Sequence, residues 1–419
     1  MPRLWASLVT LGCLLFAGCG DDTGSGAGHT GGGGAGGGTG ATSSSGGTAG
    51  AAGGLADGGG GSQSMGGAGG DGGAGGAPVD PACEALGASL QAAIEEHYQS
   101  SQPSPGGASV AVIRGSCRWV GAVGEAQPGE PMTTDHHFRI ASVTKTFVAT
   151  TLLKLVDEGL VGLDDTLDQY VPSLPNGDKI TVRMVLDHRS GLFDYLTDAA
   201  FWQQALAQPN TAVTPQALVD VATSHAPTFA PGQGWGYTNT GFILAGMVIE
   251  AVTDTSAGAA IHARTIDPVG LSETSFDGED PLPSPMAHGF GTQGEDLTFA
   301  LHPSVNWTAG AMVATAGDLA DWAKALYGGQ VLPPAALAEM LTPVGTGIPG
   351  LDYGLGAFLY DASKVGNISD AVGHGGNLPG YKTDMMYLTN DGTVVVQMTN
   401  ADAGPNYTGV LLVTLVNNP

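Results

Sequence analysis

The chain has 419 residues, 70 of them glycine, and its 39 acidic and 13 basic side chains give a net charge of −26. So few cations leave no basic surface for a phosphate backbone, which excludes nucleic-acid binding. The glycine excess is local: residues 20–77 hold 29 of the 70 glycines, and the rest of the chain has an ordinary globular composition.

The chain begins with an export signal. Residues 1–18 carry one basic side chain and an apolar run that is too short to span a membrane. The segment Phe16-Ala17-Gly18-Cys19 resembles a bacterial lipobox, in which cleavage before the cysteine allows its lipid modification. We therefore expect an exported protein anchored to the cell envelope through Cys19. A plain secretory signal is the alternative.

Residues 19–77 are predicted to be a tether. They are rich in Gly, Ala, Ser and Thr and cannot bury enough apolar surface to offset the entropy of ordering. As a Gly-rich coil the segment would span on the order of 40 Å. A spacer through a wall or coat is the other interpretation. Residues 78–419 then form the folded domain.

The folded domain opens with a predicted helix over residues 84–99 and a hairpin of strands 109–114 and 117–124. In an exported protein the remaining cysteines, Cys83 and Cys117, are expected to form a disulfide that joins this helix to the second strand. Two buried thiols are the alternative.

A helix is predicted from Phe138 to Glu158, apolar on nearly every face and therefore buried. Ser142 and Lys145 lie three residues apart near its start, so their side chains share one face. A serine hydroxyl needs a neighbouring base to act as a nucleophile, and a desolvated lysine can be that base. The first turn of a helix also offers free N–H groups to a developing oxyanion.

Two later segments supply companions for this pair. Tyr237 and Asn239 form a Y-x-N set in a Gly-rich loop before a predicted helix over 242–252, and alternation around one residue would point both into one cleft. His374-Gly375-Gly376-Asn377 precedes two predicted strands, 383–389 and 393–399, joined by an Asn390-Asp391-Gly392 turn. Consecutive glycines on a strand let a substrate backbone approach closely.

Taken together, these motifs resemble the serine β-lactamase and penicillin-binding D,D-peptidase superfamily, in its class C and carboxypeptidase branch. The segments that carry the resemblance are 138–148, 180–192, 237–239, 309–319, 353–356 and 374–376. The resemblance implies an α/β fold in which a five-stranded antiparallel sheet is flanked by helices. The first and last helices, the last over 409–416, would cover one face, and a mostly helical subdomain over roughly 163–310 would lie on the other.

The resemblance also implies roles for the residues. Ser142 would become acylated while Lys145 accepts its proton, and Tyr237 would pass a proton to the leaving group. Asn239 would bind the acyl side chain, and His374 would support the Tyr237 hydroxyl electrostatically. The backbone N–H groups of Ser142 and Asn377 would form the oxyanion hole beside Gly375 and Gly376, and Trp307 would line the cleft.

Each role has a structural alternative. Tyr237 and Asn239 could serve the backbone of a turn, His374 could be a hydrogen-bonded core histidine, and Trp307 a core side chain. His136 and His137 are expected to be exposed. Asp164, Asp165 and Asp168 lack the spacing of a calcium loop, so no metal and no cofactor are predicted.

Two departures from the branch's pattern bear on the substrate. Phe358 and Gly375 stand where residues that hold a peptide's terminal carboxylate are expected, and Lys364 is the nearest cation, in a predicted turn. The chain is therefore predicted to be a D-alanyl-D-alanine carboxypeptidase-like peptidase or a related amide or ester hydrolase. A class C-like β-lactamase, a small-acyl esterase and a non-catalytic penicillin-binding sensor are the alternatives. We expect a monomer whose partners are a small substrate and, through the lipid, a membrane.

Overall fold

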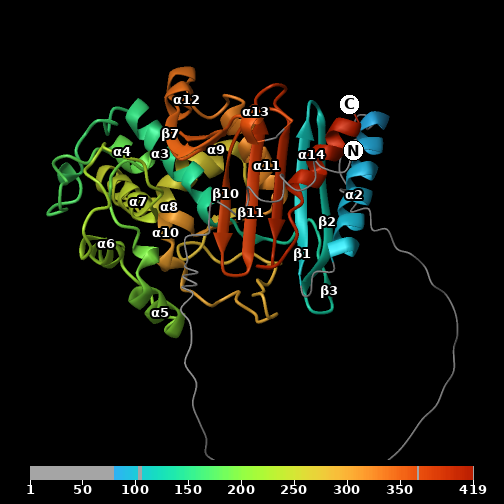
Figure 1. Ribbon diagram of the computed structural model, residues 1–419, viewed down its shortest axis with the longest axis horizontal. Helices are drawn as coiled ribbons and strands as arrows, with labels where there is room; N and C mark the ends of the chain where they lie inside the picture. Colours follow the sequence, from blue (N-terminus) through green and yellow to red (C-terminus); the bar gives the residue numbers. More distant parts are fainter. Residues whose placement is uncertain (1–79, 102–105, 366–367, 419) are drawn as a thin grey trace, which may run out of the picture. The chain divides into compact units, whose positions relative to one another are not determined.

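The computed structural model describes residues 80–101, 106–365 and 368–418. The predicted signal peptide, the lipidation site Cys19 and the tether 19–77 lie outside the described residues. The fold is the predicted α/β arrangement of a large antiparallel sheet with flanking helices (Figure 1).

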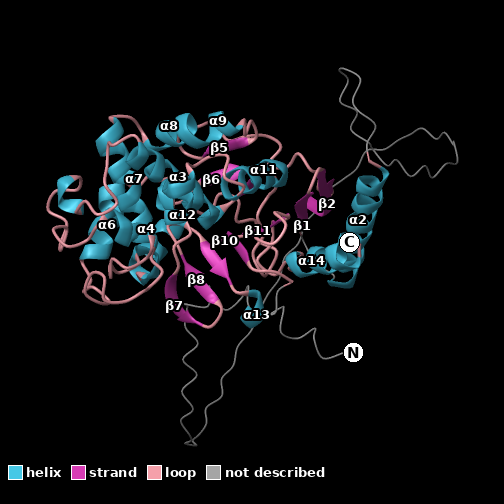
Figure 2. Ribbon diagram, turned by 90° about the horizontal axis from the view of Figure 1, so that it is seen from above, coloured by secondary structure: helices cyan, strands magenta, loops and turns pink. Residues whose placement is uncertain are grey.

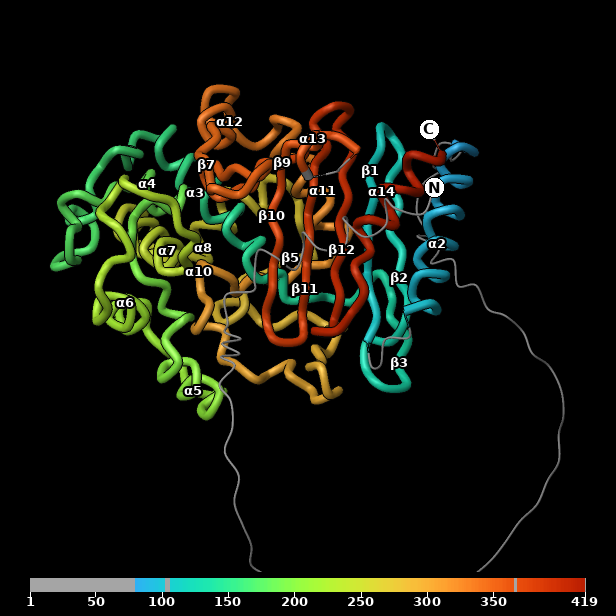
Figure 3. The backbone as a smooth tube through the Cα atoms, viewed as in Figure 1, coloured from blue at the N-terminus to red at the C-terminus, as the bar shows by residue number. Residues whose placement is uncertain are grey.

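The sheet has nine strands in the order β3-β2-β1-β12-β11-β10-β9-β8-β7, and neighbours run antiparallel. Figure 3 shows β1, near the start of the described chain, lying beside β12, near its end. The strands are β1 (Gly107–Arg114), β2 (Cys117–Gln127), β3 (Glu130–Pro131), β7 (Val344–Ile348), β8 (Leu351–Tyr353), β9 (Phe358–Tyr360), β10 (Ala371–Leu378), β11 (Tyr381–Leu388) and β12 (Val394–Thr399).

The five predicted strands are β1, β2, β10, β11 and β12, so the predicted strand number was four too low. The missed strands have two to five residues each, too few for an alternating pattern to show in the sequence. One of them matters for function, because β9 pairs with β10 and brings Phe358 opposite Gly373.

Helices α2 (Pro81–Ser101) and α14 (Thr408–Asn417) cover one face of the sheet, as predicted. Their apolar side chains, among them Leu90, Ile94 and Leu411, form a core with Val110 and Val395 of the strands. The predicted disulfide between Cys83 and Cys117 is present and joins the first turn of α2 to the first residue of β2.

The other face packs against α11 (Ala316–Tyr327), and Figure 2 shows α11 and α14 on opposite sides of the sheet. Behind α11 lies α3 (Thr144–Asp157), which is buried throughout its first ten residues. Aromatic stacking links the two helices, with the rings of Phe147 and Trp322 4.1 Å apart. The prediction of a central buried helix is therefore confirmed.

The predicted start of that helix was wrong. Phe138–Arg139 form strand β4, Ala141–Val143 form a short 3₁₀ turn (η1), and α3 begins only at Thr144. The reason is a second, three-stranded sheet in the order β4-β6-β5, with β5 at Thr274–Phe276 and β6 at Met312–Ala314. Pairing with β6 draws Phe138 and Arg139 into an extended conformation that the local apolar pattern does not reveal.

Most elements between residues 163 and 310 are helices, as predicted. They are α4 (Val182–Leu186), α5 (Ala199–Ala207), α6 (Pro215–Thr223), α7 (Asn239–Thr253), α8 (Ala257–Ile261), a π-helical turn (His262–Ile266), α9 (Asp267–Val269) and α10 (Trp307–Gly310). The remaining short helices of the described chain are α12 (Pro334–Met340) and α13 (Ala362–Val365), with 3₁₀ turns at Leu167–Gln169, Tyr195–Thr197 (η3) and Pro303–Val305.

Within the described ranges, no single helix is long and apolar enough to cross a membrane. The bent pair of α7 and Ala257–Val269 passes that test only when both are counted together. Since α7 is mostly buried among other helices, it is a core helix of the fold.

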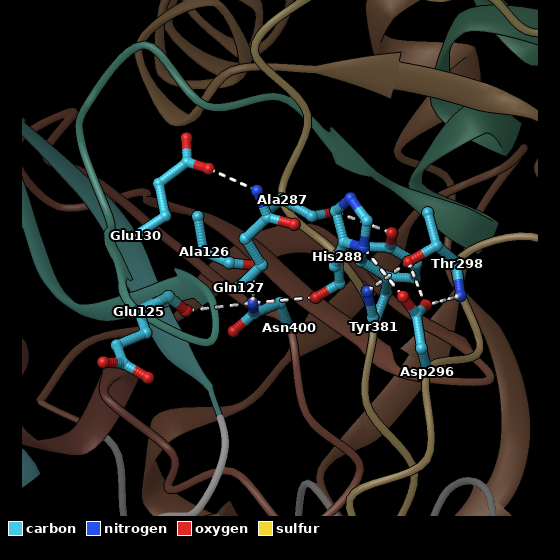
Figure 4. Close-up of polar contacts among 11 residues, drawn as sticks. Glu125, Ala126, Gln127, Glu130, Ala287, His288, Asp296, Thr298, Tyr381 and Asn400 are labelled. Atoms are coloured by element: carbon cyan, nitrogen blue, oxygen red, sulfur yellow. Dashed lines mark hydrogen bonds and ion pairs between the residues drawn. The ribbon is translucent and has the colours of Figure 1, made fainter. Parts of the chain in front are cut away.

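One buried asparagine joins three distant parts of the sheet end. The Asn400 side chain donates to the carbonyl oxygens of Glu125, Ala126 and His288 (Figure 4). Its Oδ1 accepts from the Gly107 N–H at 2.6 Å. Nearby, the Tyr381 hydroxyl donates to the Ala287 carbonyl at 2.7 Å. These bonds hold the loop that contains residues 287 and 288 against β2 and the start of β1.

Asn400→Ala should therefore lower the free energy of unfolding by about 3 kcal/mol, because it leaves buried backbone groups without partners. Asn390→Ala, in the exposed β11–β12 turn, is the matched control and should change it by less than about 0.5 kcal/mol. Urea denaturation of both variants measures the difference. Equal stability of the two variants would contradict a structural role for the Asn400 contacts.

Candidate active site

Ser142 and Lys145 lie together, as their spacing predicts. Ser142 is in η1 and Lys145 is in the first turn of α3, with Lys145 Nζ 3.1 Å from Ser142 Oγ. The Lys145 side chain is fully buried, whereas Ser142 keeps 8% of its surface exposed. Lys145 Nζ also donates to Asn239 Oδ1 at 2.8 Å and to the Ala309 carbonyl at 2.7 Å. Because two N–H groups of the amine donate to Asn239 and Ala309, the remaining position on Nζ faces the Ser142 hydroxyl.

Burial gives Lys145 the chemistry of a base. Desolvation lowers the pKa of Lys145 to about 7, and the charge of Asp194 offsets part of that effect. Near neutral pH, a large fraction of this amine is therefore unprotonated and faces a serine hydroxyl within hydrogen-bond distance. This is the arrangement that activates a serine nucleophile.

The backbone around Ser142 is strained and closely packed. Ala141, immediately before the serine, has a φ of 50°, which non-glycine residues rarely adopt and which is common at functional sites. Strand β10 runs against this turn at Gly376, where an added Cβ would lie 2.3 Å from the Ile140 carbonyl oxygen. Glycine at 376 thus lets β10 approach the nucleophile turn, and places Asn377 one residue further along the strand.

Tyr237 lies over Lys145, with the ammonium nitrogen 5.1 Å from the centre of the ring. Burial raises the pKa of Tyr237 far above its ordinary value, and the nearby Ser142 hydroxyl offsets part of the rise. Among the described residues, none forms a full hydrogen bond with the buried Tyr237 hydroxyl. Because of its high pKa, the phenol keeps its proton at neutral pH.

His374 does not support the Tyr237 hydroxyl in the expected way. Its Nδ1 contacts the Gly375 carbonyl at 2.6 Å, and its Nε2 contacts the Tyr353 hydroxyl at 2.9 Å. These partners place the ring proton on Nδ1, so that Nε2 accepts from Tyr353. Burial lowers the pKa of His374 to about 3, which keeps the ring uncharged at neutral pH. The histidine thus fixes Tyr353 and the β10 backbone.

Asn239 also has different contacts from those expected. It is the first residue of α7 and not part of the preceding loop, and its amide bridges two charged groups. Oδ1 accepts from Lys145 Nζ, and Nδ2 donates to Asp194 Oδ2 at 3.0 Å. Both ends of the amide are therefore engaged within the protein, which leaves Asn239 a role in holding Lys145.

Sequence reasoning missed Asp194 and His188. His188 has a φ of 63°, accepts from the Thr238 N–H through Nδ1, and packs its ring 4.3 Å from that of Tyr237. It belongs to the segment 180–192 that supported the resemblance, so a signal was present for it. Asp194 follows that segment by two residues, and nothing in its local sequence distinguishes it from other helix-capping aspartates.

Aromatic rings form the wall of the site where a carboxylate-binding residue was expected. Phe358 is buried on β9 and stacks parallel to Tyr237, with ring centres 6.2 Å apart. The apolar cluster contains Tyr237 and Phe358 together with Trp235, Leu351, Tyr353 and Tyr360. Lys364 is exposed in α13 and pairs with Asp361, so it takes no part in the cluster.

Three other expectations concern residues near the site. Trp307 packs against α7 at Gly246, where an added Cβ would meet its ring at 2.8 Å, and keeps 8% of its surface exposed, so its place beside the cleft stays a prediction. The expectation of exposed His136 and His137 was wrong, because both are buried and hydrogen-bonded. Among the described side chains, no three His, Cys, Asp or Glu groups gather as metal ligands would.

Comparison with known proteins gives consistent matches. A family model described as Beta-lactamase matches residues 91–411. The chain is similar to penicillin-binding protein 4* of Bacillus subtilis (strain 168), with 26% identity over 67% of this chain and 64% of that protein. It therefore spans less than two thirds of the length of this relative.

Solved structures cover the folded domain more completely. The D-stereospecific amidohydrolase from Streptomyces sp. is 32% identical with a TM-score of 0.70, over 79% of this chain and 99% of that one. The D-amino acid amidase from Ochrobactrum anthropi SV3, in complex with L-phenylalanine, is 30% identical with a TM-score of 0.70, over 80% and 99%.

Proposed function

The chain belongs to the Beta-lactamase family and is a serine hydrolase of the β-lactamase and D,D-peptidase type, and on this premise we propose that it cleaves uncharged amides and esters through an acyl-Ser142 intermediate. D-aminoacyl amides are the first substrate class to test, because two similar structures are D-stereospecific amide hydrolases. The sequence is compatible with a carboxypeptidase and with an amide or ester hydrolase, and the site favours the amide or ester hydrolase.

The observation that carries this choice is the apolar side chain at position 358. Burial, and then the charge of Lys145, lowers the pKa of both His188 and His374, and the rings of Tyr353 and Phe358 lie against His374. Phe358 fills the place expected to hold a basic residue. A free carboxylate on the leaving group would therefore enter an apolar wall without a partner, at a cost of desolvation.

The proposed reaction follows from the contacts. Lys145 accepts the Ser142 proton while Oγ attacks the substrate carbonyl, and the backbone N–H groups of Ser142 and Asn377 receive the developing oxyanion. Tyr237 donates its phenolic proton to the departing amine or alcohol and is reprotonated by the Lys145 ammonium, so that the leaving group gains the one proton that Ser142 lost. Water then attacks the acyl carbon and gives a proton to Lys145. The bond between the acyl carbon and Oγ breaks, the acid leaves, and Lys145 returns the proton to Ser142 Oγ. A neutral His374 keeps Tyr353 in place beside this cycle.

The test uses two peptides that differ only in the negative charge of the C-terminal carboxylate. A peptide ending in D-Ala-D-Ala should be hydrolysed at least about tenfold less efficiently, in kcat/KM, than the same peptide with an amidated C terminus. D-phenylalanine amide should be preferred over L-phenylalanine amide. A preference for the free acid would support a carboxypeptidase. Rapid loss of a chromogenic cephalosporin would support a β-lactamase, and stable penicillin labelling without turnover a sensor.

We also propose that the chain is exported and held at the cell envelope through a lipid on Cys19. The Cys83–Cys117 disulfide supports an oxidising compartment, since such bonds are rare in reducing ones. Mass analysis of the mature amino terminus should find an acylated Cys19. An unmodified terminus at another residue would contradict the anchor and leave the hydrolase proposal standing.

A further inference from the structure

Asp194 is a partly buried carboxylate that the reaction described above does not use. It lies at the start of η3, where Oδ1 accepts from the Leu196 N–H at 3.2 Å and Oδ2 accepts from Asn239 Nδ2 at 3.0 Å. Asn239 in turn accepts from Lys145 Nζ at 2.8 Å. The three side chains thus form a line in which one amide joins a partly buried carboxylate to the candidate base.

The segment around Asp194 is held firmly against the start of α7. The Thr240 hydroxyl donates to the Phe193 carbonyl at 2.7 Å and accepts from the Tyr195 N–H at 3.2 Å. The Tyr195 hydroxyl donates to the buried Val305 carbonyl at 2.6 Å. Asp194 lies between two anchored neighbours, so its carboxylate has little freedom to turn away from Asn239.

From this geometry we propose that Asp194 is a positioning residue that fixes the orientation of the Asn239 amide and sets the pH at which Lys145 becomes a base. A carboxylate accepts only, so Asn239 must present Nδ2 to Asp194 and Oδ1 to Lys145. If the amide turned over, its NH₂ group would face the amine and its oxygen the carboxylate. The negative charge of Asp194 also favours the protonated form of Lys145.

Of the groups around Lys145, Asp194 is the one whose negative charge raises the pKa of the amine. Among the described residues, the titratable or hydroxyl groups besides Asp194 that contact the amine or interact with its charge are Ser142, Tyr237, His188 and His374. Burial holds both histidines neutral and keeps Tyr237 protonated. Asp194 is raised in pKa by burial, while the Leu196 N–H, Lys145 and Asn239 favour its charged form.

A purely structural role is the competing explanation, because Asp194 also caps η3. The two explanations differ in what they predict for Lys145. Loss of a cap lowers stability and leaves the titration of a lysine on another helix unchanged. Loss of the charge moves that titration to lower pH. The inference rests on the proposed function only for the role of Lys145 as the base. The titration of Lys145 itself can be measured without a substrate.

The experiment follows Lys145 by NMR in the full chain labelled with ¹³C at lysine Cε. Six lysines give few resonances, and Lys145→Arg identifies the one required. Asp194→Asn and Asp194→Ser, which retains a capping oxygen, should both move the Lys145 titration down by about one pH unit. The acid limb of kcat/KM should move in the same direction by the same amount.

Asp198→Asn is the matched control, since Asp198 caps α5 four residues further on and contacts Phe201 N–H and His225. It should leave the Lys145 titration unchanged. If neither Asp194 variant moves the titration relative to wild type, the inference is overturned even when the enzyme is active. If the titration moves but the wild type neither hydrolyses nor is acylated by any substrate, the proposed function fails and the charge relation stands.

Discussion

Ser142→Ala should lower kcat/KM for the preferred amide by on the order of 10⁵-fold, because no acyl-enzyme can form without the Oγ nucleophile. The remaining groups still bind substrate, so KM should change far less than kcat. The fold should be preserved, since the change removes one oxygen from a side chain that keeps 8% of its surface exposed. Steady-state kinetics with thermal unfolding as a check on folding measures the effect.

Ser275→Ala is the matched control for this substitution. Ser275 lies on β5, and its buried hydroxyl has no partner among the described residues. Its loss should change kcat/KM by less than about twofold. Retention of more than about a hundredth of the activity in Ser142→Ala would show that another group attacks the substrate.

Lys145→Met should lower kcat/KM by about 10³- to 10⁴-fold, the range that a positioned general base contributes. Methionine occupies a similar volume without a base, and Lys145→Arg keeps a cation that cannot give up its proton. Both variants should therefore lose activity to a similar degree. Lys154→Met, on the same helix α3, is the control and should be within about twofold of wild type.

The pH profile separates a base from a mere cation. Because the pKa of Lys145 is about 7, wild-type kcat/KM should rise as pH increases through 7 and stay level above it. His374, with a pKa of about 3, and the buried His188 should add no step in this range. Full activity in Lys145→Arg, or a profile that falls as pH rises through 7, would contradict the assignment of Lys145 as base.

Local spacing was enough to predict the reacting pair. Ser142 and Lys145 share a face over a single helical turn, whether that turn is a 3₁₀ or an α-helical one, so the wrong helix start did not affect their distance. The disulfide was predictable for a similar reason, because only two cysteines remain in the folded domain. Helices with long apolar patterns were found near their observed positions.

The partners of these residues could not be read from the sequence, because they depend on contacts between distant segments. Asp194 is connected to Lys145 by hydrogen bonds through Asn239, which lies 45 residues after Asp194 in the sequence. His374 meets Tyr353 because the short strands β8 and β9 extend the sheet, and those strands leave no periodic signal. The same pairing places the apolar ring of Phe358 against Tyr237.

The most direct test of the account is to trap the acyl-enzyme. The full chain is mixed with an excess of a D-aminoacyl ester, quenched in acid within the first turnovers, and examined by intact mass and peptide mapping. The account predicts a mass increase equal to the acyl group, located on Ser142 and absent from Ser142→Ala. An adduct on another residue, or turnover by Ser142→Ala at the wild-type rate, would contradict it.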